Sequence, residues 1–336
     1  MKNFVFSAVL ILMLGLIFVQ PVLALTISPV RMEIKGDPGQ TLRGEIELFN
    51  EQDETKTFYS SSQNFEARGE SGAPYFLPDT NKGLASWISV QESVVLKADE
   101  RKTIPYAIQI PQSVEAGGYF AAIFWSTTPP QSQGSGQQVS VSGKLGMLVL
   151  LSVTGELKEG GGLLDLKIED GGRVVSSFPI TFAYRFSNDG GERVKPEGEL
   201  KVKNLFGFTT VTLEANRQKG NILPGSIRKF EIVWAEKNQE KSDVVSVEEK
   251  GKDKGFFSAV GNQWRNFALG PYKAELNLSY GKDNKTAESS FWFFVIPWQL
   301  LSIIVFILAV LGLGGWFGLK KYNRWIIKKA TQMQKK

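Results

Sequence analysis

The chain has 336 residues and contains neither Cys nor His, so it can form no disulfide and lacks the usual thiol nucleophile, general base and commonest metal ligand. Its 39 Lys and Arg exceed its 34 Asp and Glu, which gives a net charge of +5. One base precedes residue 25 and seven follow residue 319, and neither of these terminal segments contains an acid. Residues 25–319 therefore hold 31 bases and 34 acids, and this slightly acidic balance argues against nucleic-acid binding.

The first 24 residues have the composition of a secretory signal peptide. Lys2 precedes an apolar stretch from residue 5 to residue 19, and Val22-Leu23-Ala24 fits the small-x-Ala pattern of a cleavage site. Pro21 favours cleavage after Ala24, because proline breaks a helix just before the site. An uncleaved N-terminal anchor is the alternative.

Residues 25–157 are predicted to form a first immunoglobulin-like β-sandwich, because short extended segments alternate with turn signals and no amphipathic helix is evident before residue 298. Apolar and polar residues alternate over Thr41–Asn50. Met147–Leu151 is continuously apolar, as expected of a central strand covered on both faces. The predicted strands are Leu25–Ile34, Thr41–Asn50, Lys56–Phe65, Trp87–Val90, Ser93–Leu96, Arg101–Ile110, Gly118–Ser126 and Gly143–Val153.

After the boundary at Gly160-Gly161-Gly162, residues 163–296 are predicted to form a second sandwich. Seven strands with turn signals between them match the strand count of an immunoglobulin-like domain. The predicted strands are Leu164–Glu169, Phe178–Asn188, Gly198–Asn204, Thr209–Ala215, Ser226–Trp234, Gly270–Tyr280 and Ser289–Ile296. We expect Trp87, Trp125 and Trp234 to be largely buried, because large aromatic side chains dominate sandwich cores. The fold class is therefore all-β, with two tandem sandwiches.

Two segments are predicted to be flexible. Thr127–Gln138 is rich in Pro, Ser, Gly and Gln and should form a mobile hairpin, either a plain surface loop or a binding loop. Residues 236–263 form a charged insertion in the second sandwich. Its Phe256-Phe257 pair either docks on its own domain or meets a membrane surface.

Residues 298–319 are predicted to be one transmembrane helix. The segment is uncharged and apolar and is long enough to cross a bilayer. The tail, residues 320–336, contains seven bases and no acid, which indicates a cytoplasmic C-terminus and an ectodomain outside the cell membrane. A buried core helix is the alternative, but the basic tail argues against it.

We find no constellation of residues for covalent chemistry. The sequence has no Gly-x-Ser-x-Gly motif, and Gly134-Ser135-Gly136 lacks the lysine of a phosphate-binding loop. Paired acids such as Glu248-Glu249 lie in polar stretches where a solvated surface is expected. We therefore expect no enzyme, no catalytic residue, no cofactor and no metal.

Several short segments resemble the first domain of the WxL-interacting proteins. They are Ser28-Pro29-Val30-Arg31-Met32-Glu33, Pro38-Gly39-Gln40-Thr41, Ile46-Glu47-Leu48-Phe49-Asn50 and Ala116-Gly117-Gly118-Tyr119-Phe120. That family of Gram-positive surface proteins combines a signal peptide, two immunoglobulin-like domains, one C-terminal span and a basic tail. The resemblance implies peptidoglycan binding by the first domain and binding of a partner surface protein by the second.

The order of the first domain also resembles periplasmic pilus chaperones, which carry an arginine in their first strand, here Arg31. This resemblance concerns the fold, and function does not follow from fold. Arg31 is a candidate ligand-binding residue, and an exposed arginine on an edge strand is the alternative reading.

Two functions follow as hypotheses. The first is a non-catalytic surface protein that binds cell-wall polymer (peptidoglycan), a secreted surface protein, or both; Tyr75 and Phe76 are its candidate aromatic contacts for wall glycans. The alternative is a membrane-tethered chaperone or assembly factor that acts by β-strand augmentation. An anchored wall hydrolase is disfavoured by the missing His and Cys.

The charge asymmetry makes a prediction about topology. Protease added to intact cells should remove the ectodomain and leave a small protected fragment that contains residues 298–336, because moving seven bases across the membrane is costly. Immunoblotting of a C-terminal tag measures the fragment. Protection of the whole chain would contradict the orientation.

Overall fold

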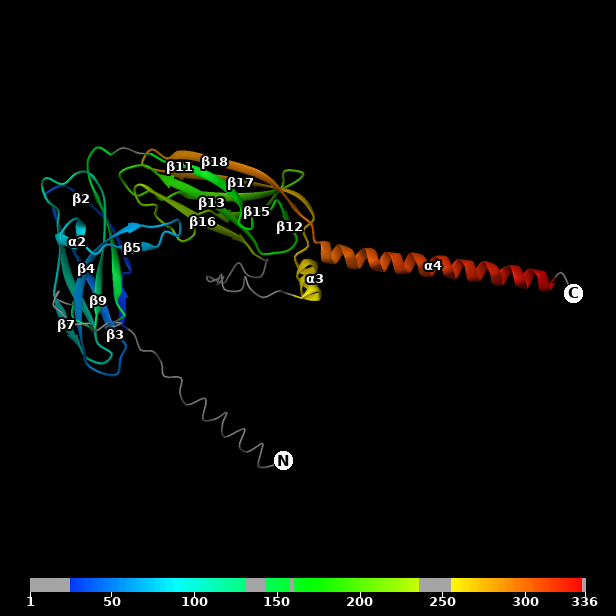
Figure 1. Cartoon of the computed structure of the whole chain (residues 1–336), viewed down its shortest axis with the longest axis horizontal. Helices are drawn as coiled ribbons and strands as arrows, with labels where there is room; N and C mark the ends of the chain where they lie inside the picture. Colours follow the sequence, from blue (N-terminus) through cyan, green and yellow to red (C-terminus); the bar gives the residue numbers. More distant parts are fainter. Residues whose placement is uncertain (1–24, 131–142, 158–159, 236–254, 334–336) are drawn as a thin grey trace, which may run out of the picture. The chain divides into compact units, whose positions relative to one another are not determined.

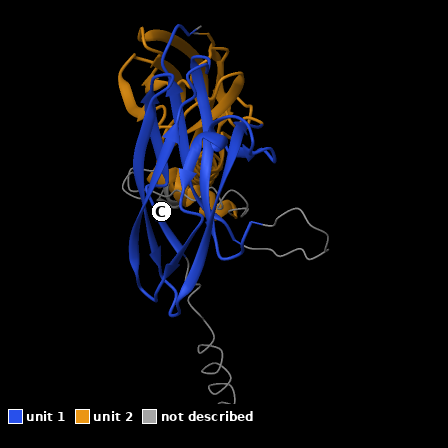
Figure 2. Ribbon diagram, turned by 90° about the vertical axis from the view of Figure 1, so that its left-hand side faces the viewer, with its two compact units in different colours: residues 1–68, 73–158 blue, residues 69–72, 159–336 orange. Residues whose placement is uncertain are grey.

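The computed structural model describes residues 25–130, 143–157, 160–235 and 255–333. The chain divides into two compact units (Figures 1 and 2). Unit 1 comprises Met1–Arg68 and Ala73–Lys158, and unit 2 comprises Gly69–Gly72 and Glu159–Lys336. Each unit is built on two β-sheets that enclose a core of its own.

Unit 1 is a sandwich of a four-stranded and a six-stranded sheet. The first sheet has the order β1-β3-β8-β6, and the second has the order β2-β10-β9-β4-β5 with β7 also paired to β4. The strands are β1 (Leu25–Ser28), β2 (Arg31–Gly36), β3 (Thr41–Asn50), β4 (Lys56–Ala67), β5 (Pro74–Phe76), β6 (Ile88–Val90), β7 (Ser93–Leu96), β8 (Arg101–Gln109), β9 (Gly117–Ser126) and β10 (Leu145–Val153).

The core of unit 1 lies between these two sheets. Ile46 and Leu48 of β3 and Ile108 of β8 are fully buried against Met147 and Val149 of β10. The prediction that Met147–Leu151 forms a central strand is confirmed, because β10 lies between β2 and β9. Trp125 is buried as predicted, whereas Trp87 is only partly buried at the margin of the core.

The predicted first strand, Leu25–Ile34, is wrong as a single strand. The chain makes two strands that belong to different sheets: β1 pairs with β3 in the first sheet, and β2 pairs in parallel with β10 in the second. Pro29 lies between them, after a cis peptide bond. Because proline has no main-chain N–H, it cannot continue a hydrogen-bonded ladder. The short strand β5 was not expected either.

Unit 2 is a sandwich of a three-stranded sheet, β11-β13-β16, and a five-stranded sheet, β12-β18-β17-β14-β15. The two-residue strand β12 was missed, and the other seven strands lie close to their predicted bounds. The strands are β11 (Gly162–Ile168), β12 (Val174–Val175), β13 (Ile180–Asn188), β14 (Glu197–Asn204), β15 (Thr209–Glu214), β16 (Ser226–Trp234), β17 (Gly270–Tyr280) and β18 (Lys285–Val295).

Aromatic side chains fill the core of unit 2. Phe182 and Phe186 are fully buried, and Phe182 makes an edge-on contact with Phe293 at 5.5 Å between ring centroids. Tyr184 stacks on Phe230 at 4.8 Å, and burial raises the pKa of its phenol. Trp234 is buried, as predicted.

A buried asparagine ends the third strand of each sandwich. The Nδ2 group of Asn50, at the end of β3, donates to the main-chain oxygens of Glu54 and Lys97 at 2.9 Å. Asn188, at the end of β13, donates to those of Glu192 and Ile222 at 2.7 and 2.9 Å. Each amide therefore satisfies buried carbonyl groups and fixes the loop that follows its strand.

Three helices complete the described chain, and one of them corrects the expectation that no amphipathic helix precedes residue 298. α2 (Leu84–Trp87) is a single turn before β6. α3 (Phe256–Arg265) occupies the end of the insertion 236–263; residues 236–254 lie outside the described residues. α4 (Trp298–Met333) continues through the basic tail, well beyond residue 319.

The fold class is confirmed: the chain is all-β in its two immunoglobulin-like sandwiches, followed by one helix that is long and apolar enough to span a membrane. Figure 1 shows this helix as the last element of unit 2. The predicted signal peptide, residues 1–24, and most of the loop Thr127–Gln138 lie outside the described residues.

Adjacent phenylalanines on β18 test how far the core of unit 2 stabilises the fold. Phe293 is fully buried and Phe294 is 44% exposed. We expect Phe293→Ala to lower the free energy of unfolding by about 3–5 kcal/mol, through lost burial and a residual cavity. The control Phe294→Ala should cost about 1 kcal/mol or less. Urea titration of the full chain in detergent micelles measures both; equal losses would contradict the assignment of this core.

Candidate functional site

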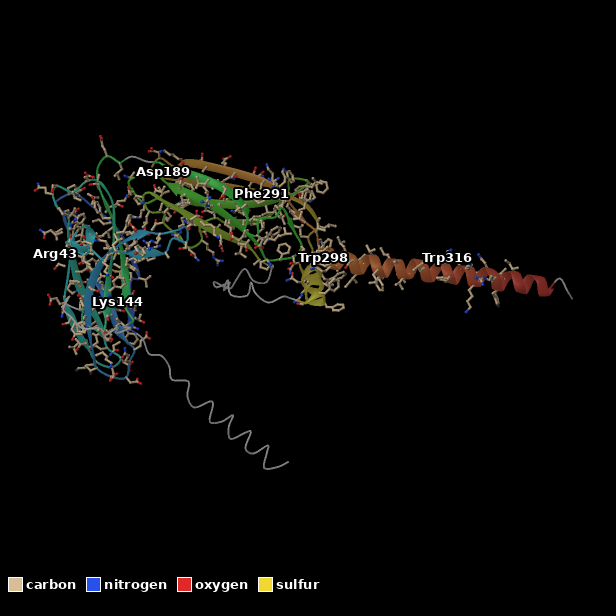
Figure 3. All side chains as sticks on the ribbon, viewed as in Figure 1. Arg43, Lys144, Asp189, Phe291, Trp298 and Trp316 are labelled. Atoms are coloured by element: carbon tan, nitrogen blue, oxygen red, sulfur yellow. The ribbon has the colours of Figure 1, made fainter. Side chains whose placement is uncertain are left out.

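The beginning of β10 is paired on one side only. β10 pairs with β9 over its whole length, Leu145–Val153, but its partner on the other side, β2, begins opposite Leu148. Within the described part of the chain, Leu145, Gly146 and Met147 therefore have no strand partner on this side, although Val30 lies beside Met147. At about 3.3 Å per residue this open segment is about 10 Å long. Figure 3 labels Lys144, the residue just before it.

The direction of the hydrogen bonds shows which residue faces the open side. The N–H group of Leu148 donates to the main-chain oxygen of Val30 at 3.0 Å, on the β2 side. Main-chain groups of successive residues in a strand point to alternate sides, so Gly146 presents its N–H and C=O on the same side as Leu148. Gly146 thus offers one donor and one acceptor to an added strand.

Apolar side chains flank the open segment. Among its described residues, unit 1 exposes four large apolar or aromatic side chains: Val30, Tyr75, Val95 and Leu145. Val30 is 71% exposed and precedes β2, while Leu145, 42% exposed, begins β10. Exposed main-chain groups beside apolar side chains are what an extended apolar segment would contact.

Packing around position 146 leaves room only for a glycine. A Cβ atom there would lie 2.6 Å from Cδ1 of Phe124 on β9, closer than any real contact. Phe124 is held on the sheet face opposite the core by an edge-on contact with Phe76, at 4.9 Å between centroids. The same packing that fixes this aromatic cluster therefore keeps the open segment free of a side chain at its centre.

Several other sheet edges in the described chain are less suited to accept a strand. β1, β5, β6 and β12 are four residues long or shorter, and β11 is interrupted by an irregularity between Leu163 and Asp165. β15 exposes only threonines and Glu214. Short strands, bulges and charges are the features by which proteins protect their edges from pairing.

The predicted ligand-binding residues are not brought together. Arg31 begins β2 opposite Leu148, next to the open segment, and its Nε lies 3.3 Å from Oε1 of Glu33. Tyr75 and Phe76 are on β5, at the opposite edge of the same sheet. The guanidinium carbon of Arg68 covers the Tyr75 ring at 3.3 Å from its centroid, and Phe76 packs on Phe65 and Phe124.

Sequence reasoning missed Val30, Leu145 and Gly146. The apolar run of β10 was recognised, but its register against β2 was not, because the break at Pro29 was read through as one strand. Among the described residues, no group of three or more acidic side chains is placed to hold a metal ion.

No protein-family model matches the sequence. No curated protein matches it either. Solved structures give distant matches. The class 5 fimbriae chaperone CfaA is 12% identical over 82% of this chain and 100% of its own, with a TM-score of 0.36. The E. coli chaperone DraB is 9% identical over 80% of this chain and 97% of its own, with a TM-score of 0.33. The Pseudomonas aeruginosa CupB2 chaperone is 8% identical over 80% of this chain and 100% of its own, with a TM-score of 0.35. Likeness at this level carries no argument about the fold or the function of this chain.

Hydrogen exchange distinguishes the open side of β10 from its paired side. We expect the Gly146 amide to exchange about a hundredfold or more faster than the Leu148 amide, whose hydrogen bond to Val30 must first open. Amide-resolved exchange on the full chain in micelles measures both rates. Equal protection of the two amides would show that this side of β10 is covered.

Proposed function

We propose that this chain is a membrane-anchored, non-catalytic binding protein that holds an extended segment of a secreted surface protein, as an assembly factor or chaperone would. The open segment of β10 carries the proposal. Gly146 presents a main-chain donor and acceptor there, and the exposed side chains of Val30 and Leu145 flank it. An added strand would lie in line with β2 and gain main-chain hydrogen bonds and apolar contacts together.

The anchor is part of the same proposal. Two residues separate the end of β18 from the start of α4, and the first 22 residues of α4 are uncharged. A cleaved signal peptide and the basic tail would place both sandwiches outside the cell membrane. In that arrangement the open edge of β10 would lie on the side of the membrane to which a secreted segment is exported.

Membership in the WxL-interacting family is a hypothesis consistent with this role, because it implies a partner surface protein. Peptidoglycan as ligand has less support. Arg68 covers one face of the Tyr75 ring, which is 37% exposed, and Phe76 packs on Phe65 and Phe124, so this edge offers a glycan less aromatic surface than the sequence suggested.

We also propose that the chain is not an enzyme. The support comes from the sequence, in which the absence of His and Cys removes the commonest general base and the thiol nucleophile. Release of soluble fragments from peptidoglycan by the purified full chain would contradict this part of the proposal.

Substitutions at the open edge test the capture of a partner. We expect Val30→Asp and Leu145→Asp each to weaken binding of a secreted protein about tenfold or more, because a buried valine or leucine contributes about 1.5–3 kcal/mol and 1.4 kcal/mol corresponds to tenfold. The full chain in micelles would be immobilised and exposed to the secreted proteins of its cells, and in parallel to insoluble peptidoglycan.

The matched control is Val95→Asp. Val95 is 55% exposed on β7, away from β10 in the same sheet, so binding should be unchanged. Equal loss in Val30→Asp and Val95→Asp would contradict the site. Binding to peptidoglycan alone, unaffected by either substitution, would favour the cell-wall function instead.

A further inference from the structure

The exposed apolar side chains of unit 2 gather at one end of its sandwich. Outside α4, nearly all large apolar residues that unit 2 exposes lie at or near the end of the five-stranded sheet where β18 finishes. Most of them come from the turn between β14 and β15 and from α3 with the residues after it. The most exposed in these two segments are Leu205, Phe206, Phe208, Phe257, Trp264 and Phe267, between 57% and 81% exposed. We call these six residues the aromatic collar.

Strand register places both parts of the collar at the same end. Asn204, the last residue of β14, pairs with Tyr272, and Tyr272 pairs with Phe293, two residues before β18 ends. The turn with Phe206 and Phe208 therefore projects beyond the sheet on the side where the chain enters α4. By contrast, Leu164, which is 49% exposed, lies on β11 next to Leu163, which pairs with Phe186 toward the other end.

Hydrogen bonds hold α3 at the start of α4. The Nε2 group of Gln263 donates to the main-chain oxygen of Ser176 at 2.9 Å and also to the Gln299 side chain, and its Oε1 accepts from the Leu300 N–H at 2.9 Å. Gln263 is almost fully buried. It thus ties α3 to the sandwich and satisfies one of the unpaired N–H groups in the first turn of α4.

The length of α4 fixes where a bilayer would meet this joint. Counted back from Lys320, the last twenty residues of the uncharged run, Leu300 to Leu319, are about 30 Å long at 1.5 Å per residue, which matches the hydrocarbon core of a bilayer. Lys320 and Lys321 then mark one boundary, and Leu300 marks the other. Because Gln263 binds the Leu300 N–H, α3 lies at the level of this outer boundary. Figure 3 labels Trp298 at the junction and Trp316 farther along α4.

The charges near α3 suit contact with a membrane surface. From Gly255 to Lys273 the chain has no acidic residue and two bases, Arg265 and Lys273. Aromatic residues are enriched where a membrane protein crosses the headgroup region, and bases are attracted to anionic lipid there. A short helix with an apolar face at this depth is typical of an interfacial helix.

We propose that the aromatic collar is seated in the outer leaflet of the bilayer that α4 spans, so that unit 2 rests on the membrane. This inference rests on the membrane anchoring in the proposed function, but it does not depend on partner capture. The occupant of the collar is lipid of that same membrane, because the span and the collar are joined through Gln263 and two residues of chain.

The absence of Cys makes a direct test possible, since any introduced cysteine is the sole labelling site. Nitroxide labels would be placed by Phe257→Cys and Phe206→Cys in the full chain, reconstituted in nanodiscs of phosphatidylcholine and phosphatidylglycerol. Leu164→Cys is the matched exposed control in unit 2, and Val310→Cys is the reference inside α4. All four side chains are at least 49% exposed, so the labels disturb no core.

Collision with oxygen and with a water-soluble nickel chelate reports the surroundings of each label. We expect the labels at 257 and 206 to have a several-fold higher ratio of oxygen to nickel accessibility than the label at 164. A water-like ratio at either collar position would overturn the proposal. Shielding that disappears in nanodiscs holding a single copy would also overturn it, because the collar would then be a contact between copies.

The label at position 310 distinguishes a failure of the collar from a failure of the membrane anchoring. An aqueous reading at 310 would show that α4 does not span the bilayer, and would overturn the anchoring together with the collar. A lipid-like reading at 310, 257 and 206 supports the collar whatever the outcome of the partner-capture experiment.

Discussion

The break in the first strand at Pro29 determines the candidate site. Without an N–H at this position the ladder between β1 and β3 cannot continue, and the chain crosses to the second sheet before it pairs again. The crossing consumes two residues, so β2 reaches β10 only at Leu148. Gly146 is left without a strand partner on one side because of where a single proline lies, while its own small size is required by Phe124. The proposed capture of a strand thus depends on a local property of the backbone rather than on a set of reactive side chains.

Most strands could be predicted because alternation and turn residues are local signals. Thr41–Asn50 and Phe178–Asn188 were placed within two residues of their observed bounds, and the apolar run of β10 indicated a central strand. Register is not local. Whether β2 starts opposite Gly146 or Leu148 depends on the sheet crossing, and the sequence near residue 146 carries no sign of it. The candidate residues Tyr75 and Phe76 were chosen as an exposed aromatic pair, but side-chain packing from β4 and β9 could not be read from their neighbours.

The helix α3 shows a different limit of sequence reasoning. Its flanks are charged and glycine-containing, its N-cap is Gly255 without a side-chain hydrogen bond, and Gly261 lies in its middle. Each of these features disfavours an isolated helix. The helix forms because Asn262 and Gln263 are bonded to the main chain of Phe178 and Ser176, far away in sequence. Tertiary contacts override weak propensity here, as they commonly do for short helices.

The joint at Gln263 also constrains how unit 2 moves. Only Ile296 and Pro297 connect β18 to α4, and the side chain of Gln263 braces the sandwich against the first turn of that helix. A domain on a long flexible linker would reorient within nanoseconds to microseconds. If α4 spans a membrane as proposed, this brace makes unit 2 share the slow rotational diffusion of the helix in lipid. The sandwich and the helix would then tumble as one object, and anything bound to unit 2 would keep a fixed inclination to the membrane plane.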